Sequence, residues 1–274
     1  MGINDDELRN WLDCPPEVDD KLPDSLQLTS IIESGGQGIV YSGFYRGNPA
    51  AVKVYFPGQV QTRIEREVLA LEKIECYSIV KLLWWGTLTY EDRELQVVVT
   101  DLIYGVALDK RLEDGNLDAG ELQSVACDVA SAIDAMWEYR IVHRDLKPSN
   151  ILIRDNGQAC VIDLGLARHI ELTSLTAMGA TWGTYGYLSP EQTKGTRQLT
   201  CKSDVYALGV VLLEAALGKH PTQGDQLQLL AYNFAQNLPR EAEAWQHSGL
   251  LKRMLSSRPT TRPKPQQIVN QVSN

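Results

Sequence analysis

The sequence lacks several features that would assign the protein to a specialised class. Its five cysteines form no C-x-x-C pair, which argues against a disulfide or zinc framework and favours reduced thiols in a cytoplasmic protein. The longest apolar run, residues 205–218, is too short to span a bilayer and contains Glu214. The first residues lack the basic stretch and apolar core of a signal peptide, and Asp6 stands where a myristoylation signal requires serine or threonine. We therefore expect no membrane partner.

Basic residues are outnumbered by acidic residues, 26 to 35. The 274 residues carry a net charge of -9, which argues against nucleic acid as a partner. Residues 1–24 hold eight acidic side chains against two basic ones, so a net -6 lies in this N-terminal arm. Within the arm, residues 4–12 predict a short amphipathic helix with Leu8, Trp11 and Leu12 on one face. We expect the arm to be a docked or inhibitory element, with a solvated acidic tail as the alternative.

The predicted secondary structure of the rest of the chain changes near residue 105. The earlier part, 25–104, predicts five strands and one helix: three strands within 27–56, a helix over 60–75, and strands over 80–88 and 94–103. The later part, 105–274, is predominantly helical, with helices expected over 108–139 and 203–217. This order predicts an α+β fold with a β-rich part followed by a helical part.

A glycine-rich stretch, "IIESGGQGIV", lies between two predicted strands. Gly35 and Gly38 supply two glycines of the G-x-G-x-x-G pattern, whereas Glu33 occupies the first glycine position. Taken alone, the stretch is more often a tight hairpin turn than a loop that binds phosphate. The motifs farther along the chain decide between the two.

A polar loop in the second part concentrates residues suited to phosphate chemistry. The string "HRDLKPSN", 143–150, brings Asp145, Lys147 and Asn150 within six residues, and Asp163 in "VIDLG" follows eighteen residues after Asp145. Carboxylate and amide oxygens are the ligands that Mg²⁺ prefers, so Asp163 and Asn150 are candidate metal ligands.

Together these motifs resemble those of the eukaryotic-type serine/threonine protein kinase catalytic domain, with a similarity to bacterial members, over residues 25–274. The matching positions occur in the family's order: Lys53 in "AAVK", Glu67 in the following helix, Asp145 in "HRDLKPSN", Asp163 in "DLG", Glu191 in "SPEQ", Asp204 in "SDVYALG" and Arg262 in "TTRP". The resemblance implies a bilobal protein-kinase fold, with a small β-rich N-lobe (25–104) containing one key helix and a larger helical C-lobe (105–274). It also implies a buried ion pair between Glu191 and Arg262.

The resemblance further implies ATP and Mg²⁺ (or Mn²⁺) as cofactors. Lys53, held by Glu67, would bind the phosphates, Asp145 would accept the substrate hydroxyl proton, and Lys147 would steady the γ-phosphate. Asn150 and Asp163 would hold the metal. The stretch at 33–38 is then interpreted as the phosphate clamp, and the nucleotide-binding set comprises Glu33, Ser34, Gly35, Gly36, Gln37, Gly38, Val40, Ala51, Lys53, Thr100, Asp101, Ile103 and Leu152.

Specificity and switching are implied in the same way. Lys147 and Thr184 resemble the serine/threonine class, so the expected substrate is a protein with a serine or threonine acceptor. Three arginines could converge beneath the activation segment, 163–191, and bind a phosphate. They are Arg63, Arg144 and Arg168. The first candidate for the phosphorylated residue is Thr181 and the second is Thr176. Pairing of the arginines with nearby acidic residues is the alternative.

Two other functional classes stay open at this point. Glu33 and Leu164 depart from the family pattern and would suit a pseudokinase scaffold or nucleotide-binding regulatory module. A small-molecule kinase of related fold is disfavoured by "GTYGYLSPEQ" and Arg262. A regulatory partner is expected at the N-terminal arm or the C-lobe. His220 is expected at the surface.

Overall fold

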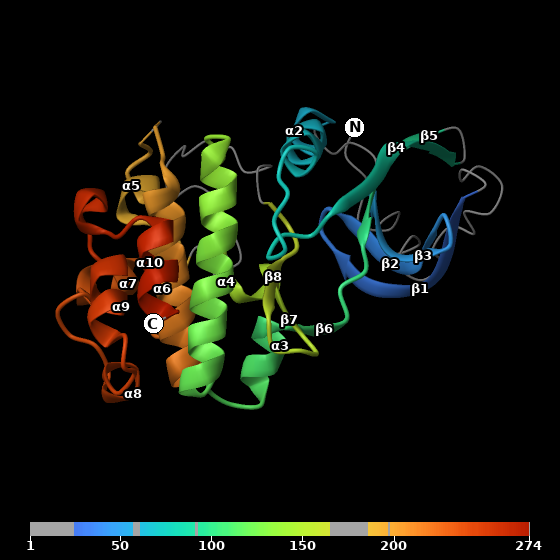
Figure 1. Ribbon diagram of the computed structural model, residues 1–274. Coiled ribbons are helices and arrows are strands. Elements are labelled where there is room, and N and C mark those ends of the chain that lie inside the picture. The colour runs from blue at the N-terminus through green and yellow to red at the C-terminus, as the bar shows by residue number, and fades with distance from the viewer. Residues whose placement is uncertain (1–24, 57–60, 91–92, 165–185, 197, 274) are drawn as a thin grey trace. The chain divides into compact units, whose positions relative to one another are not determined.

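The structure is a computed structural model that describes residues 25–56, 61–90, 93–164, 186–196 and 198–273, without the side chains of residues 61–63, 89–90 and 93. The chain divides into two compact units (Figure 1). We call Met1–Glu72 with Val80–Ile103 the sheet unit, and Lys73–Ile79 with Tyr104–Asn274 the helical unit. The predicted α+β class is confirmed by this composition.

The sheet unit contains a five-stranded antiparallel sheet in the order β1-β2-β3-β5-β4. Its strands are β1 (Leu26–Gly35), β2 (Gly38–Tyr45), β3 (Asn48–Tyr55), β4 (Leu82–Tyr90) and β5 (Arg93–Asp101). All five predicted strands are present. Short turns join β1 to β2 and β2 to β3, so strands adjacent in the sequence pair with each other.

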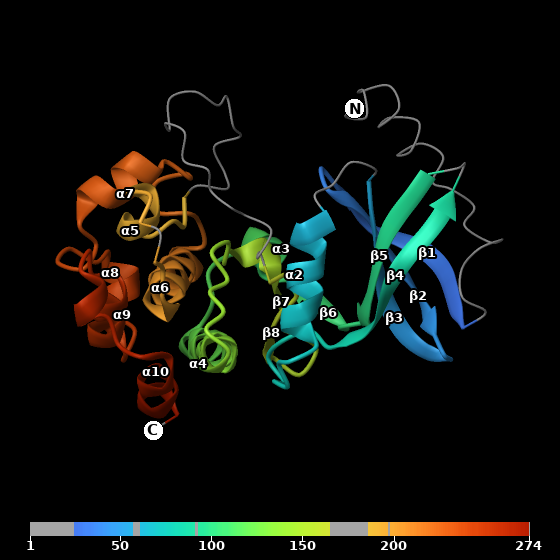
Figure 2. The same cartoon turned by 90° about the horizontal axis from the view of Figure 1, so that it is seen from above.

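The two faces of this sheet differ because side chains alternate along a strand. One face forms an apolar core that includes Ile39, Val52, Val54 and Val97, all nearly inaccessible to solvent. The opposite face packs against helix α2 (Gln61–Leu71) through the cluster Tyr55, Ile64, Val68 and Val98. Figure 2 shows α2 lying beside β4 and β5. The helix was predicted over 60–75, but it ends at Leu71, although Ile74 beyond it is still buried.

The helical unit begins with a small antiparallel sheet of β6 (Gly105–Ala107), β7 (Ile151–Arg154) and β8 (Ala159–Val161). The helix predicted over 108–139 is wrong in one respect, because it is two helices, α3 (Leu108–Glu113) and α4 (Ala119–Glu138). The break contains Gly115 with φ of 123°, and Asp118 then starts α4 by accepting the Glu121 backbone N–H at 2.8 Å. Glycine tolerance of positive φ and a strong N-cap therefore divide the segment.

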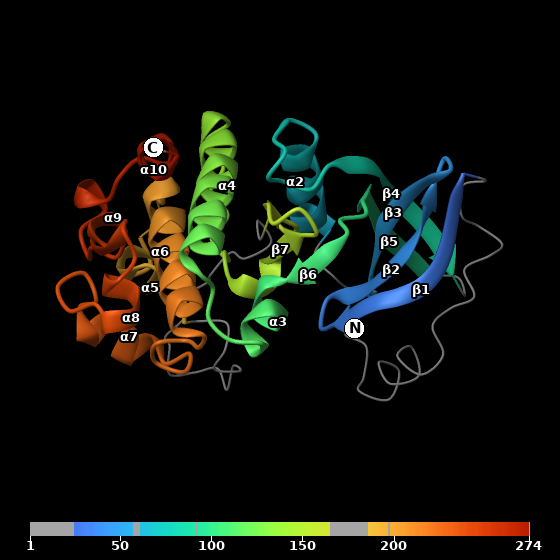
Figure 3. The same cartoon turned by 60° about the horizontal axis from the view of Figure 1, so that its bottom comes forward.

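Helix α6 (Cys201–Leu217) is the centre of the helical unit. Nearly all of its side chains are buried, because α4 packs on one side of it and α8 and α9 on the other (Figures 1 and 3). Gly218 ends the helix with φ of 70°, and a side chain there would collide with the backbone of Asn116. The remaining helices are α5 (Pro190–Thr193), α7 (Gln226–Tyr232), α8 (Arg240–Glu243), α9 (Ser248–Met254) and α10 (Pro265–Val272), with 3-10 turns at Pro148–Asn150 and Pro259–Thr261.

None of the described helices combines the length and apolar character needed to cross a bilayer.

Candidate active site

The glycine-rich stretch forms the hairpin turn between β1 and β2. Gly35 pairs with Gly38 across the turn, and the residues from Glu33 to Gln37 are exposed. Gly38 has a packing reason to be glycine, since a Cβ there would lie 2.2 Å from the carbonyl oxygen of Val54. A Cβ at Gly35 would meet open space, and the turn tip is exposed, so a ligand can approach its backbone closely.

The predicted nucleotide-binding residues of β2, β3 and β5 share one face of the sheet. Val40 lies opposite Lys53, and Ala51 lies opposite Thr100. These four side chains are half-buried, in contrast to the fully buried residues on the other face. The register thus gathers an apolar patch beside a cation, which suits an aromatic base attached to phosphate.

Three other predicted nucleotide-binding residues have different surroundings. Asp101 accepts the Lys81 backbone N–H at 2.6 Å, and its own N–H donates to the Lys81 carbonyl. Ile103 is buried in the sheet unit. Leu152 lies half-buried on β7 in the helical unit. The side chain of Asp101 thus also fixes the course of the chain before β4.

Lys53 and Glu67 are connected through a residue that the motif comparison missed. Tyr55, two positions after Lys53 and therefore on the same face, places its ring 4.8 Å from the Lys53 ammonium. Its hydroxyl donates to Glu67 Oε2 at 3.2 Å, and the Glu67 side chain is buried on α2. The period of two along a strand could have identified Tyr55 beforehand.

The loop at 143–150 brings three predicted residues together. Lys147 Nζ lies 3.4 Å from Asp145 Oδ2, and both side chains are mostly buried. Asn150 donates its Nδ2–H to the Asp145 carbonyl at 2.8 Å, which directs its Oδ1 away from that carbonyl. A carboxylate, an ammonium and an amide oxygen therefore lie on one short loop.

Two buried side chains, Asp204 and His143, hold this loop in place through hydrogen bonds to its backbone. Asp204 on α6 accepts the backbone N–H groups of His143 at 2.9 Å and Arg144 at 3.0 Å. Burial raises the pKa of Asp204 above its ordinary value, while His143 and these hydrogen bonds lower it. His143 is fully buried, and its Nδ1 accepts the Asp145 N–H at 3.3 Å.

The candidate metal ligands lie at the ends of β7 and β8. Asn150 precedes β7, and its carbonyl accepts the N–H of Ile162, the neighbour of Asp163. An amide oxygen and a carboxylate suit Mg²⁺, which takes its remaining ligands from water and phosphate. Across the described ranges, no cluster of three or more histidine, cysteine, aspartate or glutamate side chains could hold a metal by itself.

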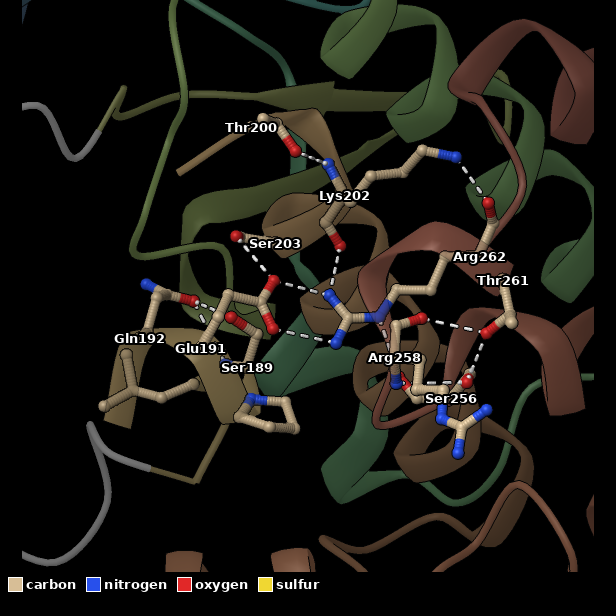
Figure 4. Close-up of polar contacts among 12 residues, drawn as sticks. Ser189, Glu191, Gln192, Thr200, Lys202, Ser203, Ser256, Arg258, Thr261 and Arg262 are labelled. Atoms are coloured by element: carbon tan, nitrogen blue, oxygen red, sulfur yellow. Dashed lines mark hydrogen bonds and ion pairs between the residues drawn. The ribbon is translucent and has the colours of Figure 1, made fainter. Parts of the chain in front are cut away.

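The predicted ion pair between Glu191 and Arg262 is present and buried (Figure 4). The guanidinium donates to both carboxylate oxygens, at 2.6 and 2.9 Å, and also to the carbonyl of Lys202 at 2.7 Å. Burial alone would raise the pKa of Glu191, but the hydrogen bonds and charge of Arg262 outweigh it and lower the pKa. Arg262 also lies 4.9 Å from the ring centre of Tyr206. The pair thus fixes α5 to the segment before α10.

Most of the predicted switching residues lie outside the described residues. These are Arg168, Thr176, Thr181, Thr184 and the side chain of Arg63. Arg144 is described, and its Nε is buried without a hydrogen-bond partner among the described atoms. Convergence of the arginines stays a prediction.

Sequence reasoning missed a cluster next to the "YLSPEQ" stretch. His220, which was expected at the surface, is half-buried and lies 3.1 Å from the carbonyl oxygen of Gly186. Its Nδ1 accepts two backbone N–H groups, from Thr222 at 3.2 Å and Gly224 at 2.8 Å. Burial lowers the pKa of His220, which keeps the ring neutral. No local motif marks such a histidine, because its partners are backbone groups rather than recognisable side chains.

Comparisons with known proteins agree with this arrangement. A family model described as "Protein kinase domain" matches residues 26–272. The chain is 30% identical over 226 residues to Probable serine/threonine-protein kinase PknB of Lactococcus lactis, an alignment that covers 79% of this chain and 35% of that protein. It is 30% identical over 230 residues to Serine/threonine-protein kinase PrkC of Bacillus subtilis, covering 81% and 35% respectively. It is 34% identical over 209 residues to Serine/threonine-protein kinase PknL of Mycobacterium tuberculosis, covering 73% and 51%. The chain thus spans about a third to a half of the length of these relatives.

Proposed function

Because the chain belongs to the protein kinase domain family, as the motifs predicted, we propose that it transfers the γ-phosphoryl group of ATP to serine or threonine hydroxyls of protein substrates. The observation that carries this proposal is the loop in which Asp145, Lys147 and Asn150 lie together. The names of the relatives support a serine/threonine protein kinase and do not favour a pseudokinase. Autophosphorylation is part of the proposal.

In this proposal the loop acts on the acceptor hydroxyl. The Asp145 carboxylate orients the hydroxyl and accepts its proton as the oxygen attacks phosphorus. Lys147, within 3.4 Å of Asp145, lowers the cost of bringing a charged phosphate close to that carboxylate. Asn150 Oδ1 and the Asp163 carboxylate would hold Mg²⁺ (or Mn²⁺), which when bound neutralises charge on the phosphates.

The sheet unit would supply the nucleotide contacts. Lys53 would bind the α- and β-phosphates, with its position fixed by Tyr55 and Glu67. Gly35 and Gly36 are exposed, and their backbone N–H groups would donate to phosphate oxygens that approach the turn tip. Val40 and Ala51 would pack against the adenine ring.

The proposal extends to the cellular location, the partners and the regulation of this activity. None of the described cysteines forms a disulfide, which suits a reducing cytoplasm; they are Cys76, Cys127, Cys160 and Cys201. The acidic balance favours partners other than nucleic acid or an anionic membrane. A regulatory partner would bind at the N-terminal arm or the C-lobe, and phosphorylation of Thr181 or Thr176 would switch the activity. Mass spectrometry after incubation with ATP would identify the phosphorylated residues.

The test of the proposed function uses radiolabelled ATP, Mg²⁺ and a generic basic protein. Asp145→Asn should abolish transfer while the Kd for ATP stays within about twofold, since this carboxylate contacts the acceptor and not the nucleotide. Lys53→Met should reduce turnover by misplacing the phosphates. Asp155→Asn, at an exposed turn residue, is the matched control. Near-normal turnover in Asp145→Asn, or no transfer by the unaltered chain, would contradict the proposal.

A further inference from the structure

The residue before Asp145 has an unusual backbone conformation. Arg144 adopts φ of 69°, in the left-handed region that residues with a Cβ rarely occupy. Such a conformation costs free energy and persists only where the surroundings hold it in place. The orientation of the peptide group between Arg144 and Asp145 determines the direction in which the Asp145 side chain points.

Two buried side chains hold Arg144 on either side of its strained Cα. Its N–H donates to Asp204 Oδ1 at 3.0 Å, and its carbonyl accepts the Nε2–H of Gln192 at 3.0 Å. Gln192 lies on α5, 48 positions from Arg144 in the sequence, and is only 3% exposed. Asp204 therefore fixes the peptide before Arg144, and Gln192 fixes the peptide between Arg144 and Asp145.

The amide of Gln192 can be oriented in only one way. Its Oε1 accepts the Ser189 backbone N–H at 3.0 Å and lies 2.9 Å from the Ser189 hydroxyl (Figure 4). Turning the amide over would set an NH₂ group against the Ser189 N–H and an oxygen against the Arg144 carbonyl. Ser189 is itself fully buried, so water could not relieve either conflict.

We propose that Gln192 is a positioning residue for phosphoryl transfer, holding the Arg144–Asp145 peptide so that the Asp145 carboxylate faces the acceptor hydroxyl. This inference rests on the proposed function and deepens it. Gln192 touches neither substrate nor nucleotide in this role. The ion pair between Glu191 and Arg262 fixes the position of α5. Gln192, which lies on α5, thereby fixes the position of the peptide before Asp145.

Gln192→Glu is the informative variant, because it changes one donor group at almost constant shape. At about pH 8 the carboxylate has no proton to donate and repels the Arg144 carbonyl. A misplaced base should lower kcat about 10- to 100-fold, with the KM for ATP within about twofold of the unaltered chain. Because position 192 is only 3% exposed, burial disfavours the charged form of the introduced carboxyl. A protonated fraction at about pH 6 can donate to that carbonyl, so the ratio of variant to unaltered kcat should rise. A kcat ratio that is close to one, or that does not change with pH, would overturn the inference.

Two further variants separate positioning from folding. Gln192→Met has a similar volume and no donor at any pH, so its kcat should be low throughout, and normal turnover would count against the proposal. Gln271→Glu makes the same chemical change at an exposed site where Arg253 donates to the side-chain oxygen at 2.7 Å. Its kcat should stay within about twofold at every pH. If Gln271→Glu lowered kcat as much as Gln192→Glu does, the effect on kcat would not be specific to position 192, and this result would contradict the proposal.

A readout without turnover distinguishes this inference from the proposed function. The Asp145 N–H donates to His143 Nδ1, so its hydrogen exchange reports on the placement of the loop. Exchange at Asp145 should be faster in Gln192→Glu than in the unaltered chain at about pH 8. An unchanged exchange rate of the Asp145 N–H in Gln192→Glu would overturn the inference about Gln192, whether or not the unaltered chain transfers phosphate. An unaltered chain that transfers no phosphate would contradict the proposed function alone.

Discussion

The hydroxyl of Tyr187 donates to Glu214 Oε2 at 2.5 Å and so joins the segment before α5 to the last turns of α6. Burial raises the pKa of Glu214 to about 7, with a smaller contribution from Asp109, while the Tyr187 hydrogen bond acts in the opposite direction. Burial also raises the pKa of Tyr187, which stays protonated and remains the donor. Glu214 therefore changes its charge close to neutral pH.

The first prediction follows from this titration. An unfolded glutamate loses its proton near its ordinary pKa of 4.5, whereas folded Glu214 keeps it up to a pKa of about 7. The stabilising contribution of this group is thus full below about pH 4.5 and is lost as pH rises through about 7. Glu214→Gln keeps an acceptor for Tyr187 and has no charge, so we expect it to be more stable than the unaltered chain above pH 7. The gain should be on the order of 2 kcal/mol and should shrink toward about pH 5.

Melting temperatures at about pH 5, 6, 7 and 8 would test this expectation. Glu241→Gln, at an exposed position on α8, is the control and should leave the pH profile unchanged. If Glu214→Gln and the unaltered chain gave parallel profiles, Glu214 would not titrate near neutrality.

The second prediction concerns the buried pair of Glu191 and Arg262. Arg262→Met would leave a buried carboxylate without its cation, and we expect a loss of about 3–5 kcal/mol. Adding Glu191→Gln should recover part of this loss, because the double variant buries no charge. A double-mutant cycle by denaturant unfolding measures the difference. Lys252→Met removes a more exposed pair, Lys252 with Glu243 at 2.7 Å, and should cost far less than Arg262→Met. Additive losses in the cycle would mean that the two residues do not stabilise each other.

The fold was predictable where the pattern is local. The alternation of apolar residues identified all five strands of the sheet unit, and the run at 203–217 identified α6. The prediction failed at residues 114–118, because apolar periodicity continues through the break and the capping of α4 by Asp118 was overlooked. Helix α2 was drawn too long because Ile74 is buried without being helical.

The candidate site was predictable for a different reason. Asp145, Lys147 and Asn150 are within one loop, so the motif alone brings them together. Glu191 and Arg262 were paired only through the family resemblance, since 71 positions separate them. The side chains of Gln192 and His220 bind backbone groups of distant segments. Because almost any residue type can supply a backbone group, the sequence does not identify such partners. Tyr55 is the exception that strand periodicity could have revealed.

The third prediction tests Tyr55. Tyr55→Phe keeps the ring near Lys53 and removes the hydrogen bond to buried Glu67. Because Glu67 keeps its other surroundings, we expect a loss of about 1 kcal/mol in stability and a several-fold weaker Kd for ATP by calorimetry. Tyr55→Leu also removes the ring and should weaken binding further. Tyr77→Phe, at an exposed tyrosine of the helical unit, is the control. Equal ATP affinity in all four proteins would mean that Tyr55 does not position Lys53.

The last prediction separates the two sides of the His220 ring. Nδ1 accepts the N–H groups of Thr222 and Gly224, so the ring proton must be on Nε2, where it is donated to the Gly186 carbonyl. His220→Asn can imitate the Nδ1 acceptor and His220→Gln can imitate the Nε2 donor. Loss of the acceptor leaves two backbone N–H groups unpaired, whereas loss of the donor leaves one carbonyl unpaired. We therefore expect His220→Gln to lose about 2–3 kcal/mol at pH 7 and His220→Asn about 1 kcal/mol.

The pH dependence provides an independent check on His220. Burial lowers the pKa of this ring, so its stabilising contribution is complete above the ordinary histidine value of 6.5 and is lost as pH falls below it. Both variants lack a titratable ring, and their stability relative to the unaltered chain should therefore improve as pH falls from about 7 to about 5. His247→Asn is the control, because the ring of this half-buried histidine lies 3.2 Å from the Gln246 side-chain nitrogen, and it should show no such trend. If His220→Asn were the less stable of the two variants, the carbonyl contact would outweigh the pair of N–H contacts, and the ring would serve mainly to hold Gly186.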